Sequence, residues 1–241
     1  MSDLPYLSIV VPAYNEARRL PPTMAALAEF LRSFTQGYEV LIVVEGSTDG
    51  TLEIAAGLAA QQAHFQVIDN GSQRGKGHAV RSGMLRAQGE IVFYMDADLS
   101  VPLRDVDGFV QYFRTHPEAD VLLGNRQHPE SKIVLEQSWL RRRMGQTFNL
   151  ILRQLALAGV QDTQCGFKAF RRPAANAIFS QQRLDGFAFD VEVLLLARKL
   201  GLTVVDLPVE WRNSPESKVH MIRDSLRMLV DAIRIRRTLR S

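Results

Sequence analysis

The chain has 241 residues, of which 46% are hydrophobic and 23% charged, and its formal net charge at neutral pH is +3. This composition is that of a globular protein and excludes a wholly disordered or fibrous chain. A single cysteine excludes a disulfide framework, and no apolar run approaches the roughly 18 residues that a membrane-spanning helix needs. The first residues lack the basic-then-apolar pattern of a secretion signal, so we expect a reducing compartment.

The charge is divided unevenly along the chain. Residues 1–125 carry 9 Lys and Arg against 15 Asp and Glu, a net charge of −6, whereas residues 126–241 carry 20 against 11, a net charge of +9. Such an asymmetry often marks a protein that binds a charged partner.

Short apolar runs alternate with segments of helical periodicity in the first half of the chain. We predict strands at 7–11, 39–44, 65–68 and 90–95, and helices at 16–32, 52–60 and 78–87. Strands and helices that alternate in this way favour βαβ units, and therefore an α/β fold with a mostly parallel central sheet flanked by helices.

The rhythm changes after about residue 125. Further strands are predicted at 121–123, 166–170 and 203–209, and further helices at 139–157, 191–200 and 221–239. Because the chain has no internal repeat and no linker rich in Pro, Gly or Ser, we expect one domain over residues 1–241.

Polar residues follow the first four predicted strands, at the edge where ligands bind in an open parallel sheet. Asp96 and Asp98 follow the fourth strand. Two carboxylates at this spacing can bind one hard cation and leave its other positions to phosphate oxygens, although the same pair is common in turns. Gly75-Lys76-Gly77 opens a helix, whose backbone N–H groups favour anions, but an ordinary flexible turn fits this tripeptide equally well.

Four motifs then occur in a characteristic order: Pro12-Ala13-Tyr14-Asn15-Glu16, Gly46-Ser47-Thr48-Asp49-Gly50-Thr51, Gly75-Lys76-Gly77 and Asp96-Ala97-Asp98. In this order they resemble the nucleotide-sugar half of a family 2 inverting glycosyltransferase with the Rossmann-like GT-A fold. The segments 162–168, 187–192 and 217–218 are similar to dolichyl-phosphate β-glucosyltransferases and their polyprenyl-phosphate relatives. The resemblance runs from about residue 7 to residue 220.

This resemblance implies a UDP- or GDP-hexose donor, a polyprenyl-phosphate acceptor, and Mg²⁺ or Mn²⁺ held by Asp96 and Asp98. Residues 1–125 would be the nucleotide-sugar half and residues 126–216 the acceptor half. The implied nucleotide-sugar contacts are Pro12, Tyr14, Glu16, Glu45, Lys76 and Asp96. The implied acceptor-phosphate contacts are Arg126, Ser217 and Lys218, and the implied catalytic residues are Asp98, Arg126 and Asp190.

Asp190 and Arg141 each have an alternative interpretation. Asp190 would lie near the sugar, and would act as a base only for a hydroxyl acceptor, but Asp190 and Glu192 could instead cap the following helix. Arg141, in the run 141–143 beside Trp139, is a further candidate for phosphate or lipid headgroups, or else part of a solvated helix face.

One position departs from the family pattern. The family usually has Asp-Asp-Gly-Ser after its second strand, whereas this chain has Val44-Glu45-Gly46-Ser47. The first acid is replaced by an apolar residue, and the second is longer by one methylene. This change affects the implied contacts to the base and ribose, and with them the choice between UDP and GDP.

Residues 217–241 form a predicted basic amphipathic helix, with seven Lys and Arg against two Asp and Glu. Its apolar stripe consists of Ile222, Leu226, Leu229 and Ile233. Such a helix can lie in a membrane interface, so we expect a cytoplasmic protein, peripheral on the cytoplasmic face of a membrane, unless the stripe packs on the domain instead.

The expected reaction is the inverting transfer of a hexose to a polyprenyl phosphate, with glucose from UDP-glucose favoured because segments 164–168 and 189–192 resemble the glucosyl branch. A lipid phosphate is already an anion, so catalysis would depend on positioning and on neutralising the leaving diphosphate. The alternatives are a family 2 enzyme using GDP-mannose or a non-lipid hydroxyl acceptor, an inactive GT-A scaffold, and a nucleic-acid-binding module. We expect no nucleic-acid partner, because the basic residues lack interleaved aromatics.

Overall fold

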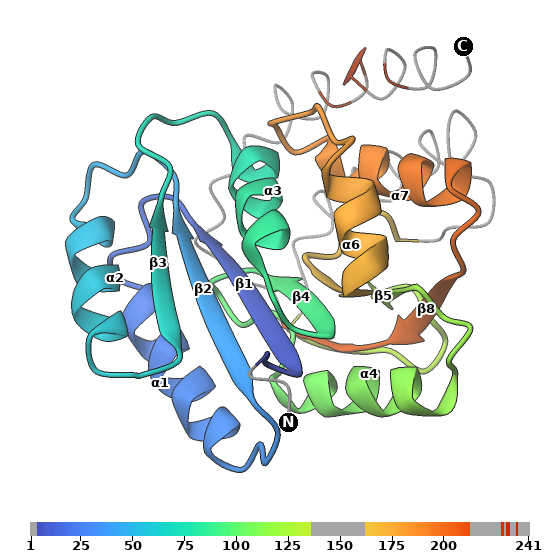
Figure 1. Cartoon of the computed structure of the whole chain (residues 1–241), viewed down its shortest axis with the longest axis horizontal. Coiled ribbons are helices and arrows are strands. Elements are labelled where there is room, and N and C mark those ends of the chain that lie inside the picture. The colour runs from blue at the N-terminus through green and yellow to red at the C-terminus, as the bar shows by residue number, and fades with distance from the viewer. Residues whose placement is uncertain (1–3, 136–161, 213–227, 229, 232–234, 236–241) are drawn as a thin grey trace.

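The computed structural model describes residues 4–135, 162–212, 228, 230–231 and 235 (Figure 1). Its central sheet contains β1 (Leu7–Ala13), β2 (Tyr38–Val44), β3 (Phe65–Asp69), β4 (Ile91–Met95), β5 (Val121–Asn125), β7 (Phe167–Arg171) and β8 (Val204–Pro208). The strand order is β3-β2-β1-β4-β7-β5-β8. Only β7 runs antiparallel to its neighbours β4 and β5, so the prediction of a mostly parallel sheet is confirmed.

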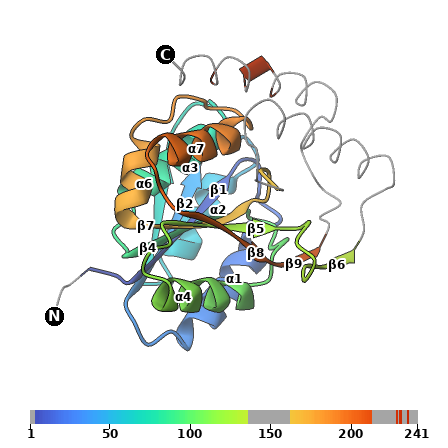
Figure 2. The same ribbon diagram turned by 90° about the vertical axis from the view of Figure 1, so that its right-hand side faces the viewer.

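Helices cover both faces of this sheet. They are α1 (Leu20–Arg32), α2 (Thr51–Ala59), α3 (Lys76–Arg86), α4 (Arg104–Thr115), α6 (Arg172–Phe179) and α7 (Phe189–Lys199). Side chains of α1, α2 and α4 pack into one hydrophobic cluster, and those of α3, α6 and α7 into a second cluster on the opposite face. Figure 2 shows α3, α6 and α7 on one side of the sheet and α1 and α4 on the other.

The two-sided burial explains the continuous apolar run in β1. Ile9 and Val11 belong to the cluster beneath α1, whereas Val10 belongs to the cluster beneath α3. Since successive side chains of a strand point to opposite faces, a strand covered on both faces needs apolar residues at every position. The absence of polar alternation therefore marks a central strand of a parallel sheet.

The structure contains four elements that were not predicted from the sequence. They are α4, α6 and a separate two-stranded parallel sheet of β6 (Lys132–Leu135) and β9 (Glu210–Arg212). The signal for α4 is present in the sequence, because Val106, Phe109, Val110 and Phe113 have helical spacing and all are buried. The predicted helix at 139–157 lies outside the described residues.

The predicted C-terminal helix falls mostly outside the described residues. Met228, Val230, Asp231 and Ile235 have helical conformation. Met228 and Ile235 are buried while Val230 is exposed. The spacing of Met228 and Ile235 by seven residues is that of two residues on the same side of a helix. Within the described part of the chain, no helix has both the length and the apolar character needed to cross a membrane.

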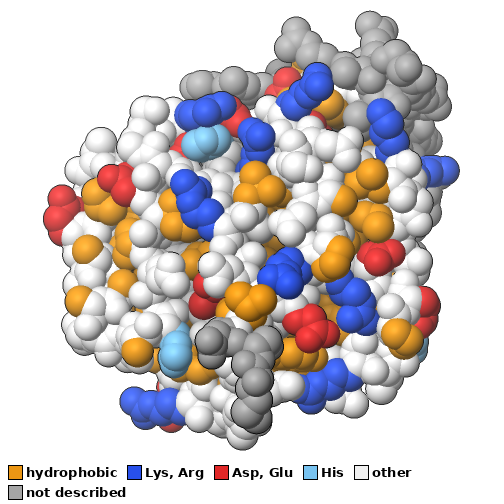
Figure 3. Space-filling view, in the orientation of Figure 1, with side chains coloured by type: hydrophobic (Ala, Val, Ile, Leu, Met, Phe, Trp, Pro, Cys, Tyr) orange, Lys and Arg blue, Asp and Glu red, His pale blue; other side chains and the backbone are white. Residues whose placement is uncertain are grey.

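Charged side chains of both signs are interspersed on the face shown in Figure 3, and the hydrophobic side chains of the described residues lie there in small groups.

Gly83 allows α3 to pack directly on the sheet. A methyl group at this position would lie 2.3 Å from Cγ1 of Val10 in β1 and 2.9 Å from Cγ2 of Val43 in β2. In α2, by contrast, no atom lies within 4 Å of a methyl group added at Gly57.

We expect Gly83→Ala to lower the free energy of unfolding by about 1–3 kcal/mol, because overpacking outweighs the gain in helix propensity. Gly57→Ala is the matched control and should raise the free energy of unfolding by up to about 1 kcal/mol. Urea denaturation followed by circular dichroism measures both changes. A Gly83→Ala protein more stable than the parent would contradict the described packing of α3.

Candidate active site

Loops from four strands meet at one edge of the sheet. Because β1, β2, β3 and β4 are parallel, their carboxyl ends lie at the same edge. Residues 14–16 follow β1, Glu45 follows β2, residues 70–75 follow β3, and residues 96–98 follow β4. The structure thus brings together the four motifs of the N-terminal half.

Lys76 links two of these loops. Its Nζ lies 2.6 Å from Oδ1 of Asp96, so the first residue of α3 is tied to the end of β4. Burial alone would lower the pKa of Lys76, but the carboxylates of Asp96, Asp190 and Asp98 outweigh that effect and raise it. The lysine is therefore a stable cation among three acidic side chains.

Gly166 provides the space for the Asp96 carboxylate. A Cβ atom at position 166 would lie 2.0 Å from Oδ2 of Asp96, closer than any side chain allows. The carbonyl oxygen of Gly166 also accepts the backbone N–H of Asp96, at 3.2 Å. The glycine in the segment 162–168 therefore has a direct role in shaping the acidic pair.

Asp98 is oriented by its own turn. Its Oδ1 accepts the backbone N–H and the hydroxyl of Ser100, at 3.0 and 2.7 Å. Its Oδ2 lies 3.9 Å from Nη1 of Arg19, a residue that the sequence analysis did not single out. Arg19 also donates to both carboxylate oxygens of Glu16, at 2.6 and 2.5 Å. In the sequence, the only sign of the contact between Glu16 and Arg19 is their spacing by three residues.

The donor set of Asp96 and Asp98 fits Mg²⁺ or Mn²⁺ bound jointly with a diphosphate. Both ions favour carboxylate oxygens, and Mg²⁺ is commonly held by one or two carboxylates together with substrate phosphates. The two side chains are partly exposed, at 36% for Asp96 and 18% for Asp98, so a ligand can reach them. Among the described residues, no cluster of three or more His, Cys, Asp or Glu side chains forms a closed metal cage.

Glu45 is turned into the protein. Its side chain is buried, and Oε1 accepts the backbone N–H groups of Arg74 and Gly75, at 2.8 and 3.2 Å. Oε2 accepts Nδ2 of Asn70 at 2.7 Å, and Nδ1 of His78 lies 3.0 Å from both oxygens. All of these partners lie in the loop after β3 or in the first turn of α3. The implied contact of Glu45 with a nucleoside stays a prediction, and this geometry does not favour it.

The first two motifs hold each other in place. Asn15 has a left-handed backbone, with φ of +53°, and its side-chain oxygen accepts the N–H of Thr48 at 2.8 Å. The hydroxyl of Ser47 accepts the N–H of Asn15 at 3.0 Å, and that of Thr51 accepts the N–H of Glu16 at 2.8 Å. The motif at 46–51 therefore acts as a support for residues 15 and 16.

The two remaining predicted nucleotide contacts, Pro12 and Tyr14, immediately precede the supported residues in the chain. Tyr14 is 36% exposed and lies at the rim of the loop edge. Pro12 is part of β1, opposite Val43 of β2.

Arg126 is fixed by a buried carboxylate. Its Nε and Nη2 donate to the two oxygens of Asp162, at 2.6 and 2.8 Å, and Asp162 is fully buried. Burial alone would raise the pKa of Asp162, but the guanidinium outweighs it and holds the pKa below its ordinary value. The guanidinium carbon lies 5.4 Å from the ring centre of Trp211. Arg126 thus presents a rigid, partly exposed cation just beyond β5.

Asp190 lies in the first turn of α7 and is only 3% exposed. Its Oδ1 accepts Nζ of Lys168 and the hydroxyl of Tyr94, both at 2.5 Å. Its charge lies in the first turn of α7, where the helix dipole favours an acid, so the alternative role at the start of the helix stays open for Asp190. The pKa of Tyr94 is raised well above its ordinary value, by burial and then by Asp190. Contact of Asp190 with a sugar stays a prediction.

Glu192 has a structural role in the described chain. It is buried, and its two oxygens accept the backbone N–H groups of Arg183 and Leu184, at 2.9 and 2.7 Å. Burial raises the pKa of its carboxyl group. Glu192 therefore anchors the loop that precedes α7 and does not cap that helix. Arg141, Ser217 and Lys218 lie outside the described residues, and their predicted contacts stay predictions.

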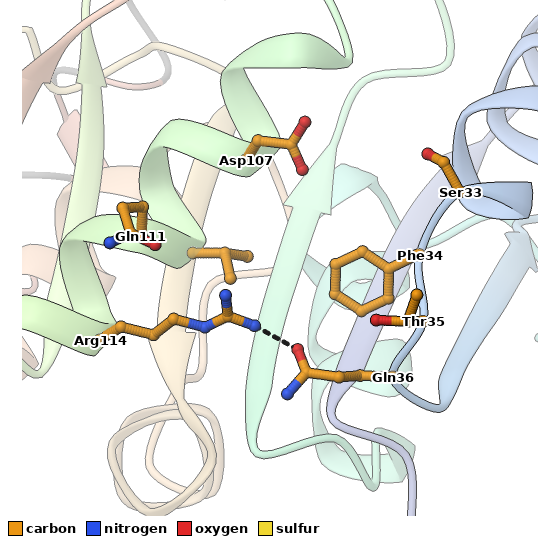
Figure 4. A pocket seen from close by; sticks show the side chains of 8 residues that line it. Ser33, Phe34, Thr35, Gln36, Asp107, Gln111 and Arg114 are labelled. Carbon is orange, nitrogen blue, oxygen red and sulfur yellow. Dashed lines mark hydrogen bonds between the residues drawn. The ribbon is translucent and has the colours of Figure 1, made fainter.

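A separate pocket of about 300 Å³ lies between the end of α1 and α4 (Figure 4). It is lined by Ser33, Phe34, Thr35, Gln36, Asp107, Val110, Gln111 and Arg114. Arg114 donates to the side-chain oxygen of Gln36 across it and lies over the ring of Tyr6, which precedes β1. The pocket is therefore at the amino edge of the strands and contains none of the predicted site residues.

A mostly parallel α/β sheet that carries an Asp-x-Asp pair and a lysine at its carboxyl edge is the arrangement that the resemblance to a GT-A glycosyltransferase implies. The chain belongs to Glycosyl transferase family 2, whose sequence profile matches residues 8–179. It is 33% identical, over 241 residues, to the dolichyl-phosphate beta-glucosyltransferase of Dictyostelium discoideum, covering 96% of this chain and 74% of that protein. The family resemblance seen in the motifs is thus confirmed.

Solved structures show the same fold. Mannosyl-3-phosphoglycerate synthase from Rubrobacter xylanophilus superposes with a TM-score of 0.69 at 24% identity, over 98% of this chain and 74% of that chain. Glucosyl-3-phosphoglycerate synthase from Mycobacterium tuberculosis, solved with Mn²⁺, UDP and glucosyl-3-phosphoglycerate, gives 0.63 at 19% identity, over 95% and 80%. At these identities the likeness establishes the GT-A fold.

We expect Gly166→Ala to displace the Asp96 carboxylate and to weaken Mn²⁺ binding in the presence of UDP by about 10- to 100-fold, as for other changes that disturb a metal ligand. Titration calorimetry with Mn²⁺ measures this affinity. Gly186→Ala is the control, because no atom lies within 4 Å of the added methyl group. An unchanged Mn²⁺ affinity in a folded Gly166→Ala protein would exclude Asp96 as a ligand.

Proposed function

We propose that this protein transfers glucose from UDP-glucose to a polyprenyl phosphate at a membrane surface, with inversion at the anomeric carbon. The observation that carries the proposal is the pair Asp96 and Asp98, partly exposed at the end of β4 and facing Lys76. The dolichyl-phosphate beta-glucosyltransferase of Dictyostelium discoideum supports the sugar and the acceptor class, because the similarity covers nearly the whole chain.

On the donor side, Asp96 and Asp98 would hold Mg²⁺ or Mn²⁺, and such an ion neutralises the negative charge of the leaving diphosphate when bound. Lys76 adds a protein cation at the same place, and the three surrounding carboxylates keep it protonated. Ser100 holds the Asp98 carboxylate in one orientation. These side chains therefore supply positioning and charge for a departing nucleoside diphosphate.

On the acceptor side, a phosphate monoester is already an anion at neutral pH and needs no strong base to attack the anomeric carbon. What it needs is a cation that fixes its orientation. Among the described residues, Asp162 accepts from Nε and Nη2 of Arg126, which leaves Nη1 for a phosphate oxygen. The bidentate pair keeps the guanidinium plane fixed before the acceptor arrives.

Asp190 would orient the sugar in this reaction. Within the described chain, Lys168 and Tyr94 both bind Oδ1 of Asp190, and Oδ2 remains for a sugar hydroxyl. A non-lipid hydroxyl acceptor would instead require Asp190 as a base, and GDP-mannose is the alternative donor. The assay below separates these possibilities.

We expect labelled glucose from UDP-glucose to appear in the lipid extract when the protein is incubated with Mn²⁺ or Mg²⁺ and a short polyprenyl phosphate. Asp98→Ala should lower kcat/KM by about 10²–10³-fold, as for loss of other groups that stabilise transition-state charge. Asp107→Ala, at the pocket on the opposite edge, is the control and should keep full activity.

Parallel reactions with GDP-mannose, and with a soluble glycan in place of the lipid, test the two alternatives. UDP binding without any labelled lipid, for either donor, would refute the lipid acceptor. Turnover that is unchanged by chelation of divalent ions would refute the metal assignment.

We expect loss of the Arg126 guanidinium to raise the KM for the polyprenyl phosphate by about 10- to 100-fold, since a charged hydrogen bond contributes about 1.5–3 kcal/mol. The UDP affinity should stay within about twofold of the parent. Because an unpaired Asp162 would destabilise the fold, the variant to use is the double change Arg126→Gln with Asp162→Asn.

Arg104→Ala is the matched control, because Arg104 is an exposed arginine that pairs with Glu210. Steady-state kinetics with each substrate varied separately give the two constants. An equal loss for donor and acceptor would show that Arg126 does not act on the acceptor side.

A further inference from the structure

Glu45 fills the space between the end of β2 and the start of α3. Its two carboxylate oxygens receive five contacts from the segment 70–78, two of them from consecutive backbone N–H groups. Among the described residues, a side chain that is 3% exposed and bonded in this way leaves no free edge for an incoming nucleoside. The preceding residue, Val44, is 1% exposed and belongs to the hydrophobic core.

The loop that Glu45 holds is also clamped by its neighbours. A Cβ atom at Gly46 would lie 2.3 Å from the backbone nitrogen of Gln73, so this loop lies directly on the turn after β2. Gly75 has a φ of +141°, and a Cβ there would lie 2.4 Å from the carbonyl oxygen of Asp185. Arg74 donates to Oδ2 of Asp185 at 2.8 Å. The loop therefore has one tightly defined path.

Lys76 is the next residue along that path. Glu45 binds the N–H groups of the two residues before it, and Lys76 then reaches Asp96 at 2.6 Å. A change in the position of the backbone at 74 and 75 would therefore move the lysine relative to the acidic pair.

We propose that Glu45 is a positioning residue, which fixes the loop 70–75 and thereby aims Lys76 at the donor diphosphate, and that it does not contact the nucleoside. The proposal rests on the proposed function for the identity of the donor. It also accounts for both departures from the family pattern, because the longer acid reaches the loop amides and Val44 packs in the core. Other residues at the carboxyl edge of the sheet must then recognise the base of the nucleotide.

Glu45→Gln tests this role with little change in shape. A glutamine has one acceptor oxygen, and its NH₂ group would face N–H donors of the loop. We expect the affinity for UDP, in the presence of Mn²⁺, to fall about tenfold or more, since the hydrogen bonds lost involve a charged acceptor. The affinity for uridine, measured by competition, should stay within about twofold of the parent, because uridine has no phosphate for Lys76 to meet.

Two further variants distinguish the length of the Glu45 side chain from its charge, and test whether Glu45 acts through Lys76. Glu45→Asp keeps the charge but is shorter by one methylene, so it should lose UDP affinity as Glu45→Gln does. In a Lys76→Met background, Glu45→Gln should cause little further loss, because two residues that act through one contact are not additive. Full UDP affinity in Glu45→Asp, or additive losses in the double variant, would overturn the proposal.

Glu39→Gln is the matched control. Glu39 is a buried acid at the other end of β2, and its carboxylate also accepts a backbone N–H, from Gln88 at 2.6 Å. This variant should change stability in a comparable way but leave UDP affinity unchanged. A comparable loss of UDP affinity in Glu39→Gln would show that the Glu45 effect is only a loss of stability.

Hydrogen exchange tests the anchoring without any nucleotide. The amides of Arg74 and Gly75 should exchange about tenfold faster or more in Glu45→Gln than in the parent, because each loses a charged hydrogen-bond acceptor. Unchanged exchange at both amides, or an equal loss of uridine and UDP affinity, would overturn the proposal. A parent protein that binds neither UDP nor GDP would refute the proposed function, and the exchange result would still decide the role of Glu45.

Discussion

The ion pair between Lys76 and Asp96 is the interaction on which the organisation of the site depends. It joins the start of α3 to the end of β4, two elements that meet only because the strands are parallel and the loop after β3 follows a defined path. A lysine held among carboxylates neutralises part of their mutual repulsion, so the acidic pair can be kept close together before any ligand arrives. The pair thus organises both the charge and the geometry of this edge.

Two other ion pairs lie beneath the loops, between Lys168 and Asp190 and between Arg126 and Asp162. Isolated buried charges are costly, and a buried pair is stable only when further hydrogen bonds satisfy the remaining groups. Tyr94 and the carbonyl of Cys165 meet this requirement for the first pair. These two ion pairs therefore hold Arg126 and Asp190 in fixed positions below the loops, although a hydrophobic replacement of the same volume would often be as stable.

The sequence predicts the sheet well because apolar runs such as that of β1 reflect burial on both faces, a local property of the chain. It also places Asp96 and Asp98 correctly at a strand end. It does not predict that Glu45 turns inward, because the amides that it binds are about 30 residues further along the chain and have no residue signature. The sequence does not predict the contacts of Arg19 with Asp98 or of Gly166 with Asp96 for the same reason, since each joins residues that are distant in sequence.

The position of β7 between β4 and β5 has one more consequence. The short stretch from Asp162 to Lys168 contacts three separate residues: Asp162 holds Arg126, Gly166 borders Asp96, and Lys168 holds Asp190. Of the three residues that make these contacts, only Lys168 belongs to β7, and Asp162 and Gly166 lie in the segment that leads into it. One short stretch of backbone thus supports side chains both in the part of the edge proposed for the donor and in the part proposed for the acceptor.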